Sequence, residues 1–77
     1  MEITVKLYSR LRTYAPGDHH LFSVRLPGDA TVSGLLERLK IPAAVQRTIL
    51  INGRRVEESA SLSPGDEVVM MPMIDGG

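Results

Sequence analysis

Alternation of apolar and polar residues predicts two strands in the first third of the chain. Residues 2–8, EITVKLY, alternate with a period of two, which is typical of a strand with one buried face. Residues 21–26, LFSVRL, alternate in the same way, so that Phe22, Val24 and Leu26 share one face. Each segment is therefore expected to contribute one side to a common core.

Between residues 31 and 41 the apolar period changes to that of a helix. Thr31 is expected to cap this helix, because its hydroxyl can accept a hydrogen bond from a free amide of the first turn. Pro42 prevents the helix from continuing. The apolar stripe, spaced i, i+3, i+4 and i+7, consists of Val32, Leu35, Leu36 and Leu39. A shorter helical turn, capped by Ser9, is expected after the first strand.

Three more strands are predicted in the second half of the chain. Residues 48–51, TILI, are almost entirely apolar, which predicts a strand buried on both faces. Asn52-Gly53 is a strong hairpin signal, because a type I′ turn needs positive φ at both positions. Residues 54–56 would return as a short partner strand. Residues 63–66, SPGD, predict another turn, and residues 67–71 predict the last strand.

The expected order is strand, strand, helix, strand, short strand, strand. This order predicts an α+β fold in which a mixed sheet of about five strands packs on one crossover helix. It is the order of the ubiquitin-like β-grasp. A chain of 77 residues makes one domain. We assign residues 1–72 to this β-grasp domain and residues 73–77 to a flexible C-terminal diglycine tail.

Composition narrows the classes of function. The chain has no cysteine, which excludes disulfides, thiolate nucleophiles and cysteine metal sites. Nine basic and nine acidic residues give a formal net charge of zero, and only three residues are aromatic, so we expect no nucleic-acid partner. No apolar run is long enough to span a membrane, and residues 1–3 open directly into a strand rather than a signal peptide. A cytoplasmic protein without a membrane partner is expected.

A catalytic centre within this chain is not predicted. Asp18, His19 and His20 are the strongest candidates for a metal or acid–base cluster. Adjacent histidines, however, point to opposite faces of a strand, and in a loop they are usually solvated. Because catalysis needs convergent groups in a pocket that excludes water, we expect a carrier protein rather than an enzyme, with no metal and no bound cofactor.

The C-terminal strand is expected to expose an apolar face. In a strand that starts at Glu67, Val69 and Met71 point away from the side that Val68 and Met70 occupy. A single helix covers only one face of a sheet, so the second apolar set would face water unless a partner covers it. Val69 and Met71 are therefore predicted to bind partner proteins.

Beyond this strand the chain is expected to become a thin stalk. Pro72 cannot donate to a ladder, so pairing should stop there. Residues 73–77 can reach roughly 17 Å when extended. Gly76 and Gly77 lack a β-carbon and can thread a passage too narrow for side chains. The stalk would carry a terminal carboxylate into the active site of another protein.

A carboxylate is ionised at neutral pH and is a poor electrophile. ATP-dependent adenylation would give it a leaving group. The acyl adenylate could then accept sulfur to form a thiocarboxylate, or an amine to form a conjugate. The absence of cysteine fits the first outcome, since carried sulfur would have to sit on the terminus.

These features together resemble the small ubiquitin-like sulfur carriers, and within that group the small subunit of molybdopterin synthase. The resemblance covers essentially the whole chain. Its motifs are Ser9-Arg10-Leu11-Arg12, Ala30-Thr31-Val32 with Leu35-Leu36, Ile51-Asn52-Gly53, Pro64-Gly65-Asp66-Glu67-Val68, Pro72 and Gly76-Gly77. In this order and spacing they are specific as a set.

The resemblance implies that a ubiquitin-activating-like adenylyltransferase uses ATP to adenylate Gly77, and that a sulfur donor enzyme supplies the sulfur of a thiocarboxylate. It also implies that the tail enters the large catalytic subunit of molybdopterin synthase and donates sulfur to a pterin precursor of the molybdenum cofactor. Gly76 and Asp75 would then lie in the partner's channel. The residues implied to dock against the partners are Val69, Met71, Pro72, Met73 and Ile74.

The sequence also departs from this group. Positions 70 and 71 are often aromatic there but are both methionine here, and Asp75 stands where a small residue is usual. A sulfur carrier of thiamin thiazole synthesis is the nearest alternative, although that group usually lacks the segment like residues 9–14. Carriers for cysteine synthesis, tRNA thiolation or tungsten cofactors, a modifier conjugated through Gly77 to target lysines, and a plain binding module are further alternatives.

Overall fold

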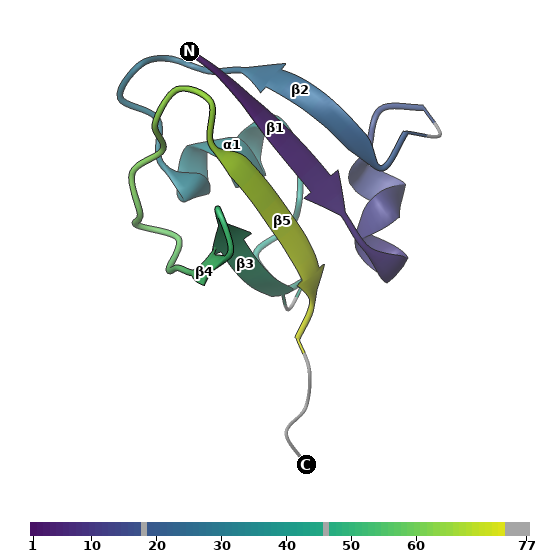
Figure 1. Cartoon of the computed structure of the whole chain (residues 1–77). Helices are drawn as coiled ribbons and strands as arrows, with labels where there is room; N and C mark the ends of the chain where they lie inside the picture. Colours follow the sequence, from purple (N-terminus) through teal and green to yellow (C-terminus); the bar gives the residue numbers. More distant parts are fainter. Residues whose placement is uncertain (18, 46, 74–77) are drawn as a thin grey trace.

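Five strands form one mixed sheet, in the order β2-β1-β5-β3-β4 (Figure 1). This computed structural model describes residues 1–17, 19–45 and 47–73. The strands are β1 (Glu2–Leu7), β2 (Leu21–Arg25), β3 (Arg47–Ile51), β4 (Arg54–Arg55) and β5 (Glu67–Pro72). A 3₁₀ helix, η1 (Ser9–Tyr14), follows β1, and one α-helix, α1 (Val32–Arg38), connects β2 to β3. The predicted mixed sheet with one crossover helix is confirmed.

The first and last strands pair at the centre of the sheet. β1 runs parallel to β5, and the register aligns Val5 with Val68 and Leu7 with Met70. The other strand pairs, β1 with β2, β5 with β3 and β3 with β4, are antiparallel. β5 is consequently the central strand, paired with β1 up to Met70 and with β3 up to Pro72, so Met73 follows directly from the middle strand of the sheet.

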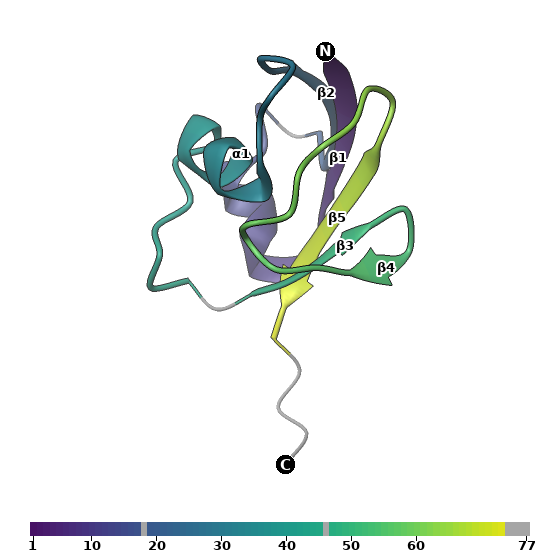
Figure 2. The same ribbon diagram turned by 90° about the vertical axis from the view of Figure 1, so that its left-hand side faces the viewer.

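The core lies between the sheet and α1, which covers one side of the sheet (Figure 2). Ile3, Val5 and Leu7 of β1 are almost completely buried, as are Val68 and Met70 of β5. The helix contributes Val32, Leu35 and Leu36, and η1 contributes Leu11, which is also fully buried. Alternate strand residues thus supply one apolar layer and the predicted helical stripe supplies the other.

Local hydrogen bonds define both ends of α1. The Thr31 hydroxyl accepts from the Gly34 amide at 3.4 Å, which confirms the predicted cap. At the other end, Lys40 adopts a φ of 58°, and the Ile41 amide donates to the Leu36 carbonyl at 3.0 Å. The left-handed conformation of Lys40 terminates the helix before Pro42 is reached and directs the Ile41 side chain into the core. Among the described residues, no helix is long and apolar enough to cross a membrane.

The predicted hairpin between β3 and β4 is also confirmed. Asn52 and Gly53 have φ values of 51° and 85°, the positive pair that a type I′ turn requires. β4 itself contains only Arg54 and Arg55, and both side chains are exposed. The hairpin therefore ends the sheet with a short, charged edge that offers little to pair with.

Two expectations about individual residues are wrong. Ser9 does not cap η1: Tyr8 occupies the cap position without a side-chain hydrogen bond, and Ser9 has a φ of 51°. The strand β3 is not buried on both faces, because only Ile49 of its residues is fully buried. The described residues supply a covering layer on the α1 side of the sheet alone, which leaves Leu50 half-buried on the opposite face.

Candidate functional site

The predicted docking residues of β5 lie on the face of the sheet that α1 does not cover. Val68 and Met70 are fully buried, whereas Val69 and Met71, which alternate with them along the strand, are half-buried. This confirms the predicted alternation of the strand. Pro72 is the last residue of β5 and pairs with Arg47 of β3, so the ladder ends where the missing amide of proline was expected to end it.

Residues from three strands complete an apolar surface around these side chains. In the register of the sheet, Val69 lies between Lys6 of β1 and Leu50 of β3. Met73 is 46% exposed and Tyr8, just after β1, is 39% exposed. The apolar side chains of this surface, together with Ser9, line a pocket of about 540 Å³. We call this surface the outer-face patch; it consists of Tyr8, Leu50, Val69, Met71, Pro72 and Met73.

A lysine borders the outer-face patch. The ammonium of Lys6 lies 5.0 Å from the centre of the Tyr8 ring. The hydrogen bond to Tyr8, followed by the charge interaction with Tyr8, raises the pKa of Lys6. The patch therefore combines an apolar centre with a positive charge at its border, in keeping with the polar rim of protein interaction surfaces. Tyr8, Leu50 and Lys6 were not predicted as part of the site. The alternation of residues 2–8 places Lys6 and Tyr8 on the outward face, whereas residues 48–51 do not alternate and give no such indication for Leu50.

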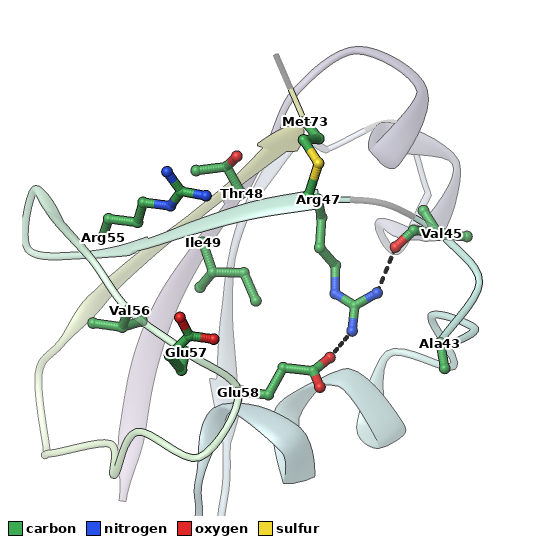
Figure 3. A pocket seen from close by; sticks show the side chains of 10 residues that line it. All are labelled: Ala43, Val45, Arg47, Thr48, Ile49, Arg55, Val56, Glu57, Glu58 and Met73. Carbon is green, nitrogen blue, oxygen red and sulfur yellow. Dashed lines mark hydrogen bonds and ion pairs between the residues drawn. The ribbon is translucent and has the colours of Figure 1, made fainter. Parts of the chain in front are cut away.

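A second pocket of about 310 Å³ lies on the other side of the tail's origin (Figure 3). Its central residue is Arg47, whose side chain is only 7% exposed. The guanidinium forms an ion pair with Glu58 and donates to the Val45 carbonyl at 2.5 Å. Arg47 Nε has no hydrogen-bond partner among the described residues. The arginine thereby connects the start of β3 to the loops on both sides of the pocket.

Met73 lines both pockets, so the chain leaves the sheet between them. One pocket is largely apolar, and the other contains arginine and glutamate side chains in addition to Ile49 and Val56. Sequence reasoning missed the second pocket because Arg47 and Glu58 are 11 residues apart and belong to no motif. The remaining predicted tail residues, Ile74, Asp75, Gly76 and Gly77, lie outside the described residues.

The described part of the chain offers no grouping of three or more histidine, cysteine, aspartate or glutamate side chains that could hold a metal ion. His19 and His20 are both exposed, and Asp18 lies outside the described residues. The geometry therefore provides two pockets at the point where the chain leaves β5.

A family model described as Mut7-C ubiquitin matches residues 1–76. The chain belongs to the Mut7-C ubiquitin family. No curated protein matches the sequence. This family membership extends over the sheet, α1 and the outer-face patch, so the whole described fold is that of a ubiquitin-like domain.

Solved structures agree with the family. A Pyrococcus furiosus protein assigned as molybdopterin converting factor, subunit 1, is 25% identical, with a TM-score of 0.78 over 95% of this chain and 98% of its own. Small archaeal modifier protein 1 of Haloferax volcanii is 22% identical, with a TM-score of 0.78 over 95% and 98%. In a complex of subunits 1 and 2 of molybdopterin-converting factor from Helicobacter pylori, the matching chain is 17% identical, with a TM-score of 0.68 and full coverage of both chains.

These matches confirm the predicted ubiquitin-like β-grasp and the predicted resemblance to the small ubiquitin-like sulfur carriers. The neighbours include both a modifier protein and subunits of molybdopterin-converting factors. The Mut7-C ubiquitin domain described here accordingly has the fold of small carrier or modifier proteins.

Proposed function

We propose that this Mut7-C ubiquitin-family protein is a sulfur carrier that acts through the carboxylate of Gly77, as the small subunit of a molybdopterin synthase. The observation that carries the proposal is the position of the outer-face patch. It surrounds the end of β5 and extends to Met73, the first residue of the tail and the last described residue. A partner bound there would be positioned to receive the tail.

The proposed chemistry begins on an activating adenylyltransferase. The Gly77 carboxylate attacks the α-phosphorus of ATP, and pyrophosphate leaves. A hydrosulfide equivalent from a sulfur donor enzyme then attacks the acyl carbon, and AMP leaves. The product is a thiocarboxylate. Its sulfur then attacks the acceptor and displaces a leaving group there, which gives an acyl thioester. Water attacks the acyl carbon of this thioester, so that the sulfur stays on the acceptor and the Gly77 carboxylate is restored. ATP is bound by the activating enzyme, and this chain contributes the acyl group.

The reach of the tail supports this division of roles. Residues 73–77 span at most roughly 17 Å when extended. The reactive carboxylate can thus travel well beyond the sheet while Pro72 stays paired with Arg47. The asymmetry of the two pockets beside Met73, one apolar and one with ionic side chains, gives a partner the means to orient the tail as it binds.

The second subunit in the Helicobacter pylori complex supports a catalytic partner of the same kind for this chain. On this proposal, the large catalytic subunit covers the outer-face patch and holds residues 74–77 in a channel. Asp75 requires a basic or solvated position there, because an ionised carboxylate is costly to bury without a partner. The same chemistry with another acceptor would serve thiamin thiazole synthesis or another thiolation pathway.

A protein modifier is the second candidate, favoured by the likeness to small archaeal modifier protein 1. In that case a lysine amine of a target, rather than sulfur, attacks the activated acyl carbon of Gly77. Adenylation and docking through the outer-face patch would be common to both functions, so the fate of the acyl adenylate distinguishes them.

Intact mass spectrometry of the protein isolated from its own cells tests the proposal. A mass that corresponds to a chain ending at Gly77, with one terminal oxygen replaced by sulfur, is the expected result. Conjugates with lysines of other proteins would instead establish the modifier. Neither product in cells that make the activating enzyme, or a chain that continues beyond Gly77, would overturn both.

A further inference from the structure

The outer edge of β2 is a second docking surface, at the opposite side of the sheet from β3 and β4 (Figure 1). We propose that this edge binds an extended, acidic peptide segment of another protein, which pairs with β2 and places apolar side chains in the pocket beside it. The inference is independent of the proposed function, because it involves neither the tail nor the outer-face patch.

Hydrogen bonds at both ends of β2 fix the phase of its ladder with β1. At one end, the Leu26 amide donates to the Met1 carbonyl at 2.8 Å, and the N-terminal ammonium of Met1 donates to the Leu26 carbonyl at 2.7 Å. At the other end, the Leu7 amide donates to the His20 carbonyl at 2.8 Å. Residues opposite one another in an antiparallel pair alternate between hydrogen-bonded and non-hydrogen-bonded.

This alternation shows which backbone groups are free. Like His20 and Leu26 at the two ends, Phe22 and Val24 occupy hydrogen-bonded positions, so their amides and carbonyls point to β1. Leu21, Ser23 and Arg25 therefore direct theirs away from the sheet. Among the described residues, no loop or turn forms a backbone hydrogen bond with Leu21, Ser23 or Arg25. β2 thus presents three consecutive donor–acceptor pairs to a peptide that runs alongside it.

A pocket of about 570 Å³ accompanies this edge. It lies between β2, the residues after η1 and the C-terminal end of α1. Tyr14, Phe22 and Leu39, all half-buried, provide its apolar surface. Side chains of a strand alternate between the two faces of a sheet. Every second residue of a peptide paired with β2 would therefore point into this pocket, which favours apolar residues at those positions.

The charge around the pocket selects the class of peptide. Arg25, Arg38 and Lys40 line it, and its lining residues include no carboxylate, in a chain whose formal net charge is zero. Arg25 is only weakly engaged, because Glu2 lies 3.9 Å away and both side chains are largely exposed. An acidic peptide complements these three cations. A second copy of this chain does not, because pairing two β2 edges would bring the same cations together.

Docking at β2 would leave the outer-face patch free. The pocket beside β2 opens on the α1 side of the sheet, whereas the patch lies on the other face, around β5. An acidic partner can therefore bind while the tail is engaged elsewhere.

A fluorescently labelled peptide in which valine alternates with threonine and two glutamates stand at each end, tested against the full-length protein, provides the probe. We expect saturable binding by anisotropy, and no binding of the same peptide with lysine in place of glutamate. Amide hydrogen exchange should slow on binding at Leu21, Ser23 and Arg25. Phe22 and Val24, which already donate to β1, should change little. This alternating protection would not arise from binding at the outer-face patch.

Variants separate the backbone and charge contributions. Ser23→Pro removes an outward donor without touching the β1 ladder, so it should abolish peptide binding while the fold persists. Arg38→Glu combined with Lys40→Glu should weaken binding by about tenfold, because it reverses two charges at the rim of the pocket. Arg54→Glu combined with Arg55→Glu makes the same change in charge at the opposite edge and should have no comparable effect.

Several results would overturn the proposal. They are absence of binding by the wild-type protein, equal binding of the lysine peptide, protection mapped to β5, and a folded Ser23→Pro variant that binds normally. Concentration-dependent dimerisation through β2 in place of peptide binding would also overturn it. Loss of sulfur transfer with intact peptide binding would contradict the proposed function alone.

Discussion

The side chain of Asn52 bridges to Asp66, with Asn52 Nδ2 donating to Asp66 Oδ1 at 2.9 Å. Asn52 Oδ1 accepts from the Glu67 amide, also at 2.9 Å. Asp66 Oδ2 in turn accepts from the Ser63 amide at 2.8 Å. The turn between β3 and β4 is thereby attached to the turn that starts β5. One asparagine fixes the hairpin and the beginning of the strand that leads to the tail.

Replacement of Asn52 should accordingly lower stability. Asn52→Ala loses both side-chain hydrogen bonds and places alanine at positive φ, so we expect a decrease of about 2 kcal/mol in the free energy of unfolding. Asn52→Gly loses the same bonds but tolerates this backbone conformation, and should cost about 1 kcal/mol. Urea unfolding of both variants measures the difference, and equal costs would contradict the assignment of backbone strain to alanine.

The Arg47–Glu58 pair should show measurable coupling. Arg47→Met removes the charge but keeps much of the buried stem, whereas Glu58→Gln leaves the guanidinium with a neutral partner. Because Glu58 is about half exposed, solvent screens the pair, and we expect a coupling energy of about 1 kcal/mol. A double-mutant cycle by urea unfolding, repeated at high salt, would measure it. Additive effects of the two substitutions would show that the ion pair adds nothing.

Adjacent methionines should respond in opposite ways to the same substitution. Met71→Glu places a charge on the half-buried outer face, so it should weaken association with the activating enzyme or the large subunit by tenfold or more and leave the domain folded. Met70→Glu buries that charge in the core and should unfold the domain. Circular dichroism and binding measurements distinguish the two outcomes.

Ser33→Glu is the matched control for Met71→Glu, because it adds the same charge at an exposed position of α1, away from the outer-face patch. It should leave association unchanged. Equal weakening by both substitutions would point to a general charge effect, and unfolding by Met71→Glu would assign this side chain to the core.

Deletion of Gly77 should abolish sulfur transfer without affecting thermal stability. The shortened tail ends in a carboxylate about 3.3–3.6 Å short of the reactive position. Deletion of Asp75 shortens the tail equally but keeps both glycines, so it separates the need for length from the need for a terminal diglycine. Sulfur transfer in a reconstituted reaction is the measurement, and retained transfer without Gly77 would exclude it as the carrier.

Much of the fold could be predicted because its strongest signals are local. The period-two segments give β1 and β2, the i, i+3, i+4 stripe gives α1, and Asn52-Gly53 gives the hairpin. The strand β3 shows the limit of this reasoning. The short, almost entirely apolar run TILI does not reveal whether the sheet is covered on one face or on both. The structure shows that α1 covers one face alone.

The candidate site was predicted in part for the same reason. Alternation along β5 is a local property, so Val69 and Met71 could be placed outward from the sequence. The contributions of Tyr8 and Leu50 depend on the order of strands, which brings β1 and β3 to either side of β5. Arg47 and Glu58 meet through packing of two loops, and no periodicity encodes such a meeting.

The parallel pairing of β1 with β5 has a consequence for biosynthesis. β1 is made first, but its central neighbour is β5, which is synthesised last among the strands. Contacts so distant in sequence form late and slow the folding of small domains. A chain interrupted on the ribosome before β5 lacks the strand that joins β1 to β3, so it has neither a continuous sheet nor an outer-face patch. Synthesis of β5 is thus a precondition for forming the outer-face patch, so a protein that recognises this patch cannot bind a chain that lacks β5.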